Sequence, residues 1–135
     1  MPRASAIIVS LAAWLLVLGG AQAAFADDAT DISNIGFVLY TKSHSPGTLN
    51  ARWMFTTEYG GPGLATGGPR DGFAGNYHVR YFYENGEFSD EYDLVIKKSG
   101  DTYQARWLVD GRVQAVGVGM ELEGGLAIGW RRVTN

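Results

Sequence analysis

The stretch of sequence that decides the fold is residues 102–130, TYQARWLVDGRVQAVGVGMELEGGLAIGW. Apolar and polar side chains alternate along it with a period of two, which is typical of strands that bury one face. The pairs Asp110-Gly111 and Glu123-Gly124 interrupt this alternation with residues that favour tight hairpin turns. The stretch therefore predicts three successive antiparallel strands, at Thr102 to Val109, Arg112 to Leu122 and Leu126 to Val133.

The same period of two recurs upstream, between further turn signals such as Asn85-Gly86. It predicts strands at Ile35 to Lys42, Leu49 to Thr56, Asn76 to Tyr83 and Glu91 to Lys98. No segment among them has the pattern of a crossover helix, and closing a meander into a small barrel removes its exposed sheet edges. We therefore predict an all-β antiparallel meander of about eight strands closed into a small barrel, with a two-sheet β-sandwich as the alternative.

The segment from Tyr59 to Gly72 departs from this pattern. It holds six glycines and two prolines, which disfavour regular structure. The sequence predicts a long loop here, with one short strand at Leu64 to Thr66. Because ordering such a loop costs conformational entropy, we expect either a mobile lid that closes beside the aromatic residues when a ligand binds or a plain connection between strands.

The N-terminus has the features of a secretory signal peptide. Arg3 precedes a 13-residue apolar run from Ala6 to Leu18, and small residues before Asp27 provide a cleavage site. The predicted organisation is a signal peptide at 1–26, a flexible polar arm at 27–34 and a single all-β domain at 35–135. The apolar run is shorter than the roughly 20 residues that cross a bilayer. Because the sequence has no cysteine for disulfides or lipid attachment, we expect a periplasmic or secreted bacterial protein.

Charge and motifs exclude several function classes. The formal net charge is −3, and no basic stripe is available to bind phosphates, so a nucleic acid is not expected as a partner. His44 and His78 are the only histidines, and neither has a metal-site spacing. No serine stands in a Gly-x-Ser-x-Gly elbow. We therefore expect no metal, no cofactor and no catalytic residue that can be named from the sequence.

Some glycines and aromatic residues resemble those of a known group of proteins. They lie in Gly75 to Val79, Tyr92 to Ile96, Gly100 to Tyr103, Trp107, Gly117 to Gly119 and Gly125 to Trp130. The pattern resembles small exported bacterial proteins of uncharacterised function, some labelled fibronectin-binding, whose strand-rich repeats are similar to lipocalin and avidin barrels. The chain lacks the early Gly-x-Trp strand of lipocalins and the biotin-binding residues of avidins. The resemblance implies a small barrel and carries over no functional residue.

The aromatic side chains allow two interpretations. If they fill the core, with Trp107 and Trp130 largely buried, the arginines on the opposite faces point to solvent and pair with acidic residues across strands. These arginines are Arg52, Arg80 and Arg106, and their expected partners are Glu84, Asp93 and Glu121. If the barrel keeps a cavity, the aromatic face lines it and stacks on a flat or apolar ligand. The lining would then comprise Trp53, Tyr81, Tyr103, Trp107 and Trp130.

Recognition is expected at the open end of the barrel and at the long loop, because packing occupies the strands of a small barrel. The candidate ligand-binding residues are Tyr59, Arg70, Tyr81 and Tyr103. The sequence thus favours an exported, non-enzymatic barrel module that binds a small molecule, a glycan or a protein. The alternative is an enzyme, an isomerase or hydrolase, which predicts His78 facing a concave pocket with a carboxylate in hydrogen-bond reach.

Overall fold

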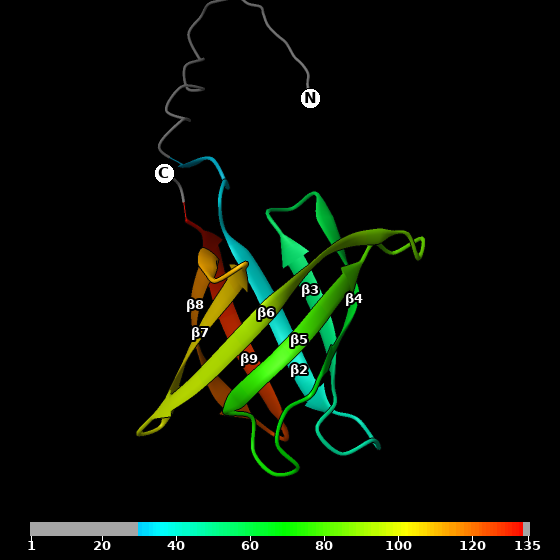
Figure 1. Cartoon of the computed structure of the whole chain (residues 1–135). Coiled ribbons are helices and arrows are strands. Elements are labelled where there is room, and N and C mark those ends of the chain that lie inside the picture. The colour runs from blue at the N-terminus through cyan, green and yellow to red at the C-terminus, as the bar shows by residue number, and fades with distance from the viewer. Residues whose placement is uncertain (1–29, 134–135) are drawn as a thin grey trace, which may run out of the picture. The chain divides into compact units, whose positions relative to one another are not determined.

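The computed structural model describes residues 30–133 and contains eight antiparallel strands that close into one barrel (Figure 1). This arrangement confirms the predicted barrel and excludes the two-sheet sandwich. The strands are β2 Gly36–Lys42, β3 Leu49–Phe55, β4 Tyr59–Thr66, β5 Gly75–Phe82, β6 Phe88–Ser99, β7 Thr102–Val109, β8 Arg112–Leu122 and β9 Gly125–Arg132. The predicted signal peptide and the first residues of the predicted arm lie outside the described residues.

Each strand pairs with the next along the chain, and β9 pairs with β2 to close the barrel. Between β7 and β8, Asp110 and Gly111 have φ angles of 51° and 78°. Between β8 and β9, Glu123 and Gly124 have φ angles of 45° and 86°. Two successive residues with positive φ match the twist of a two-residue hairpin. The turn signals of the sequence therefore fix where these strands pair.

One half of the barrel interior is densely filled with aliphatic side chains. The connection between β4 and β5 covers this end and inserts Phe73, whose side chain is buried. The hydroxyl of Tyr77 donates a hydrogen bond to the carbonyl oxygen of Phe73 at 2.8 Å, and Nζ of Lys42 donates one to the carbonyl oxygen of Gly72. We call this half the closed half; its fully buried aliphatic residues are Leu49, Leu94, Ile96, Leu126 and Ile128.

In the segment from Tyr59 to Gly72, the short strand predicted at Leu64 to Thr66 is confirmed as the end of β4, whereas the loop predicted before it is wrong, because β4 begins at Tyr59. Two positions of β4, Gly61 and Gly63, require glycine because atoms of β5 and the residue that follows it lie very close to the backbone there. A Cβ atom on Gly61 would lie 2.0 Å from the carbonyl oxygen of Phe82, and one on Gly63 would lie 2.7 Å from Cδ1 of Tyr81. These glycines therefore serve close packing rather than flexibility. The rest of the segment connects β4 to β5 at the closed half, so it does not form a lid at the other end.

The strand register shifts at two places, both in the half of the barrel opposite the closed half. One shift lies between Tyr81 and Phe82 in the pairing of β5 with β6, and the other between Trp107 and Leu108 in the pairing of β7 with β8. A β-bulge increases the local twist and re-aims the neighbouring side chains. We call this part of the barrel the open half, and Tyr81 and Trp107 mark its base.

The last residue of the predicted flexible arm is held by the barrel. Asn34 has a φ angle of 49°, and its amide nitrogen donates a hydrogen bond to the carbonyl oxygen of Arg132 at 3.2 Å. Its side-chain oxygen accepts one from the backbone N–H of Arg132 at 2.7 Å. Asparagine adopts left-handed conformations more readily than most residues. Asn34 therefore fixes the end of β9 at Arg132, whose side chain lies in the open half.

Candidate functional site

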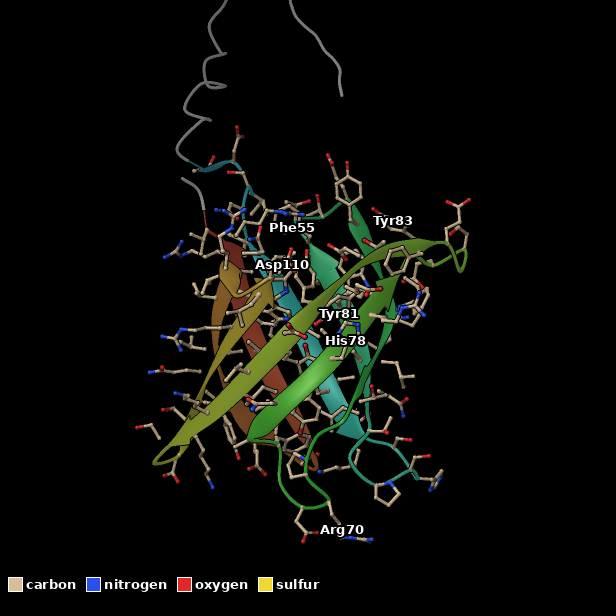
Figure 2. The ribbon with its side chains drawn as sticks, viewed as in Figure 1. Phe55, Arg70, His78, Tyr81, Tyr83 and Asp110 are labelled. Carbon is tan, nitrogen blue, oxygen red and sulfur yellow. The ribbon has the colours of Figure 1, made fainter. Side chains whose placement is uncertain are left out.

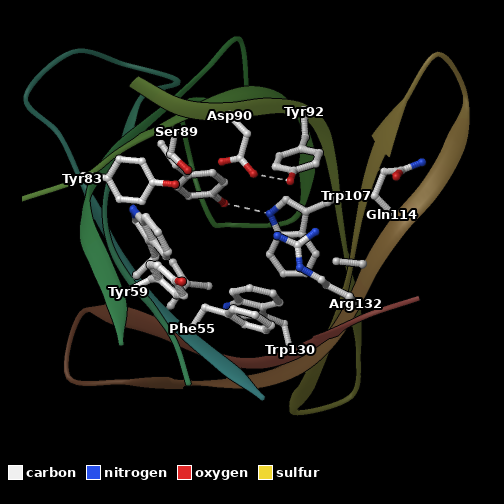
Figure 3. Close-up of a pocket in the computed structure, with 14 residues that line it drawn as sticks. Phe55, Tyr59, Tyr83, Ser89, Asp90, Tyr92, Trp107, Gln114, Trp130 and Arg132 are labelled. Atoms are coloured by element: carbon white, nitrogen blue, oxygen red, sulfur yellow. Dashed lines mark hydrogen bonds between the residues drawn. The ribbon is translucent and has the colours of Figure 1, made fainter. Parts of the chain in front are cut away.

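The open half contains a cavity of about 350 Å³, which we call the cup. It lies at the barrel end formed by the β3–β4, β5–β6 and β7–β8 hairpins, and Figure 3 looks into it. Eight of its 14 lining residues are aromatic, and these eight come from six different strands or their ends. The lining is Val38, Trp53, Phe55, Tyr59, Tyr81, Tyr83, Ser89, Asp90, Tyr92, Trp107, Gln114, Ala115, Trp130 and Arg132.

Two features determine where the aromatic rings lie: the alternation of side chains along each strand, and a glycine that leaves room for a neighbouring ring. Trp53 and Phe55 are two residues apart on β3, so both point into the barrel. Trp130 occupies the space that a side chain on β2 would need, because a Cβ atom on Gly36 would lie 2.1 Å from its Cε2. A glycine on one strand thus makes room for a ring on the next.

The base of the cup is a hydrogen-bonded group of three buried aromatic residues. The hydroxyl oxygens of Tyr40 and Tyr81 are 2.5 Å apart, and Nε1 of Trp107 donates a hydrogen bond to the Tyr81 hydroxyl at 2.8 Å. These side chains are at most 6% exposed. Burial raises the pKa of both Tyr40 and Tyr81 well above the ordinary value for a phenol, so both hydroxyls stay neutral at physiological pH.

This group has one hydrogen more than it uses. The indole N–H and the two hydroxyls supply three hydrogens, whereas two hydrogen bonds join the three side chains. When Tyr40 donates to Tyr81, the Tyr81 hydroxyl keeps a hydrogen with no acceptor among residues 30–133. Since Tyr81 lines the cup and Tyr40 does not, a ligand carbonyl or ether oxygen could accept this hydrogen at the base.

The walls of the cup are aromatic pairs. The rings of Phe55 and Trp130 are stacked, with centroids 5.0 Å apart and planes inclined by 13°. On another side, the ring centroids of Trp53 and Tyr83 are 5.9 Å apart. Nε1 of Trp53 donates a hydrogen bond to the carbonyl oxygen of Phe82 at 3.0 Å, which fixes the indole plane. Rings held in this way offer flat apolar surfaces at little cost in side-chain entropy.

Two opposite charges lie in the cup without forming an ion pair with each other. Asp90 accepts a hydrogen bond from the hydroxyl of Tyr92 through one oxygen, and its other oxygen accepts none from residues 30–133. The guanidinium of Arg132 stands 5.2 Å from the ring centroid of Phe55 and has no carboxylate within 4.0 Å among the described residues. Burial makes the largest contribution to a raised pKa of the Tyr92 hydroxyl, and the hydrogen bond to Asp90 raises it further. The hydroxyl therefore remains a hydrogen-bond donor.

This arrangement can bind a flat ring between aromatic walls and hydrogen-bond its edges. Asp90 offers a free acceptor oxygen and Arg132 offers donors, and the Tyr81 hydroxyl offers one more donor when Tyr40 donates to it. An apolar concave site with a few polar groups at its edge is the usual form of a small-molecule site. The cup also has a size within the range of such sites.

The structure brings together two of the four residues predicted to bind a ligand. Tyr59 and Tyr81 line the cup. Arg70 lies in the β4–β5 connection, at the opposite end of the barrel from Tyr83 (Figure 2). Tyr103 is buried near the start of β7 in the closed half, where its hydroxyl donates a hydrogen bond to Glu121. Arg70 and Tyr103 therefore lie outside the cup.

Both interpretations of the aromatic face are partly right. Trp107 is only 2% exposed, whereas Trp130, predicted to be largely buried, is only partly buried because it forms a wall of the cup. Of the predicted lining, Trp53, Tyr81, Trp107 and Trp130 face the cup and Tyr103 does not. Some rings thus fill the core while others leave a cavity.

Sequence reasoning missed the two charged residues of the cup. Asp90 and Tyr92 are two residues apart on β6 and share a direction, as do Trp130 and Arg132 on β9. The predicted strand began at Glu91, one residue after Asp90, so its inward position was not recognised. Extending the alternation from Tyr92 by one step would have found it.

The outer surface carries the remaining predicted polar residues. Arg52 pairs with Glu84 at 3.0 Å, which is one of the expected partners, whereas Arg80 pairs with Glu91 at 3.3 Å, which is not among them. His78 lies on the outer face of β5, with its side chain 48% exposed and Nε2 3.2 Å from the Glu91 carboxylate. Its carboxylate neighbour is therefore on the surface, not in the cup.

Comparisons with family models, with curated proteins and with solved structures find no match to this chain. Within residues 30–133, no helix has the length and apolar character needed to cross a membrane. The same residues contain no group of three or more histidines and carboxylates arranged to hold a metal ion. The geometry of the cup is therefore the basis for a functional proposal.

Proposed function

We propose that this protein is an exported, non-enzymatic binding module that holds a small, flat, partly apolar molecule in the cup. The observation that supports this proposal is the combination of aromatic walls with two unpaired charges, Asp90 and Arg132, in one cavity of about 350 Å³. A cavity that served packing alone would be filled or wholly apolar.

The charges define the ligand more closely. Asp90 is half-buried, and a carboxylate oxygen without a partner there costs free energy unless a ligand compensates it, whereas Arg132 is exposed at the rim, where it is free to meet a ligand. A ligand with a donor or positive group near Asp90 and an acceptor or negative group near Arg132 would provide that compensation. The walls then select a planar ring system, since the stacked rings of Phe55 and Trp130 present flat faces.

The enzyme alternative has no comparable support. Asp90 is the only carboxylate among the 14 lining residues, and no histidine is among them. Acid–base catalysis ordinarily needs a proton donor and a proton acceptor that both reach the substrate. The Tyr81 hydroxyl cannot act as a base near neutral pH, because burial raises its pKa well above the ordinary value and keeps it protonated.

Two aromatic fluorescent probes of opposite charge test this proposal. Anilinonaphthalene sulfonate is an anion with a flat naphthalene ring and proflavine is a planar cation, and binding of either should quench the tryptophans that line the cup. Arg132→Gln should weaken the anion roughly 10- to 100-fold and spare the cation, because a charge-assisted hydrogen bond contributes about 1.5–3 kcal/mol. Asp90→Asn should do the reverse.

The matched control is Arg80→Gln, which removes an exposed arginine on the outer face of β5. It should leave the affinity for both probes unchanged. Near-ultraviolet circular dichroism of each variant checks that the aromatic packing is intact. If neither probe binds, or if Arg80→Gln weakens the anion as much as Arg132→Gln does, the cup is not the binding site.

A further inference from the structure

The hydrogen bond between the two hydroxyls at the base of the cup can run in either of two directions. Tyr40 donates to Tyr81, or Tyr81 donates to Tyr40. Trp107 donates to Tyr81 in both cases, because an indole N–H cannot accept a hydrogen bond; Figure 3 marks this bond with a dashed line. The direction decides which hydroxyl keeps an unused hydrogen, and therefore what the base presents to a ligand.

Burial decides between the two directions. If Tyr81 donated, the unused hydrogen would be on Tyr40, which is 0% exposed, does not line the cup and has no other hydrogen-bond partner among residues 30–133. A buried donor without an acceptor is unfavourable. If Tyr40 donates, the unused hydrogen is on Tyr81, which lines the cup, where solvent or a ligand can accept it. The bond therefore runs from Tyr40 to Tyr81.

This direction makes the Tyr81 hydroxyl a donor only. Its oxygen accepts one hydrogen bond from Tyr40 and one from Trp107. A hydroxyl oxygen has two lone pairs, so both are occupied. A ligand N–H or amine placed at the base would find no acceptor on Tyr81, whereas a ligand oxygen would find a donor.

Packing holds this donor in place. The ring centroid of Tyr81 lies 6.1 Å from that of Trp53 and 6.2 Å from that of Tyr92. On β4, Gly63 packs so closely that a Cβ atom there would lie 2.7 Å from Cδ1 of Tyr81. A hydroxyl fixed in this way loses little conformational entropy when a ligand binds, so it can discriminate between ligands.

We propose that the ligand of the cup is a flat ring system with a carbonyl oxygen on its buried edge, and that Tyr81 selects this ligand by donating a hydrogen bond to that oxygen. The inference rests on the proposed function, because it names the class of molecule that the cup holds. Ring ketones, lactams and quinones belong to this class. Their carbonyl oxygen projects about 1.2 Å beyond the ring edge, toward the base, while the opposite edge is left for Arg132 at the rim.

Two tricyclic probes of nearly the same shape test the selection. Fluorenone has a carbonyl group where fluorene has a methylene group, and equilibrium dialysis measures the affinity of each. The unmodified protein should bind fluorenone about 3- to 10-fold more tightly than fluorene, which is the effect of one neutral hydrogen bond. Tyr81→Phe should abolish this preference and change the affinity for fluorene by less than about twofold.

The matched control is Tyr77→Phe, which removes another buried tyrosine hydroxyl, in the closed half. It should keep the preference for fluorenone. Near-ultraviolet circular dichroism checks that the aromatic packing of each variant is intact. The infrared stretching frequency of an isotopically labelled fluorenone carbonyl gives a direct signature: it should be lower in the unmodified protein than in Tyr81→Phe, because a hydrogen bond weakens the C=O bond.

Tyr40→Phe tests the direction of the bond between the hydroxyls. Tyr40 does not line the cup, and Tyr81 keeps its hydrogen in this variant, so the preference for fluorenone and the low carbonyl frequency should both remain. If Tyr81 instead donated to Tyr40, the same substitution would free its hydrogen, and the preference would rise above that of the unmodified protein.

The outcomes separate this inference from the proposed function. Equal affinities for fluorenone and fluorene, a preference that Tyr81→Phe retains, or a preference that rises in Tyr40→Phe would each overturn the selection by Tyr81, while binding of the charged probes would still support the cup as a site for flat molecules. If the charged probes and both tricyclic probes all fail to bind, the proposed function and this inference are both wrong.

Discussion

The two halves of the barrel interior are built from the same strands but differ in structure: one is densely packed and the other holds a cavity. In the closed half, aliphatic side chains such as Leu94, Ile96 and Ile128 are at most 1% exposed, and Phe73 covers them. In the open half, the same strands carry aromatic rings and two charges around a cavity. The boundary between the halves is the buried group of Tyr40, Tyr81 and Trp107.

The difference teaches that stability and recognition are separated along the strand axis. Dense packing in the closed half gives the favourable burial that a chain without disulfides needs. The open half can then keep a cavity, which lowers stability, because the other half holds the fold. Four experiments test this division, from the largest expected effect to the smallest.

The largest effect is expected in the closed half. Leu94→Ala removes a side chain that is 0% exposed, and the free energy of unfolding should fall by about 2–5 kcal/mol. Tyr59→Ala, at a rim residue that is 49% exposed, should change it by only about 0.5 kcal/mol while weakening probe binding. Urea denaturation measures both. Equal losses of stability at the two positions would contradict the division.

A second change tests the boundary. Gly63→Ala places a Cβ atom 2.7 Å from the ring of Tyr81, so the ring must move or β4 must shift. We expect a loss of about 1–3 kcal/mol in the free energy of unfolding. We also expect weaker quenching by both probes, because Tyr81 forms the base of the cup. A variant with unaltered stability would show that β4 does not pack against Tyr81 as described.

Alkaline pH tests the same boundary through its hydroxyls. Burial raises the pKa of Tyr40 in the folded protein above its unfolded value near 10, so its contribution to stability is complete below pH 10 and is lost as the pH rises beyond that. One pH unit above 10, this loss should reach about 1.4 kcal/mol for Tyr40. Tyr40→Phe should therefore flatten the alkaline decline in the free energy of unfolding, and Tyr59→Phe, at the exposed rim, should not.

The smallest effect is expected at the rim. Thr56 has a φ angle of 55°, which is unfavourable for a β-branched residue, although its hydroxyl bonds to the carbonyl oxygen of Phe55. Thr56→Asn should stabilise the protein by about 0.5 kcal/mol, since asparagine tolerates this conformation. Thermal unfolding measures the shift. A lower midpoint would mean that the hydroxyl contacts outweigh the strain.

The closed barrel was predictable because period-two alternation and glycine turns are local signals. Asp110-Gly111 marks the hairpin that the structure contains, and its φ angles are those that this turn needs. Strand β4 was not predictable in the same way. Its glycines indicated a loop, and only the neighbouring Tyr81 and Phe82, distant in sequence, show why glycine is required there.

The candidate site was predictable only in its aromatic part. Alternation put Trp53, Tyr81 and Trp130 on inward faces, and these residues do line the cup. Which inward residues share one end of the barrel depends on the register between strands, which no local pattern contains. For this reason Tyr103 was grouped with Tyr81, although the structure places it in the closed half.

Nuclear magnetic resonance of the amide groups, recorded while anilinonaphthalene sulfonate is added, tests the central claim most directly. The division of the barrel predicts that shifts concentrate at cup residues such as Phe55, Asp90 and Arg132, while the amides of Leu94 and Ile128 in the closed half stay unchanged. Shifts confined to the outer faces of the strands, or spread evenly through both halves, would contradict it.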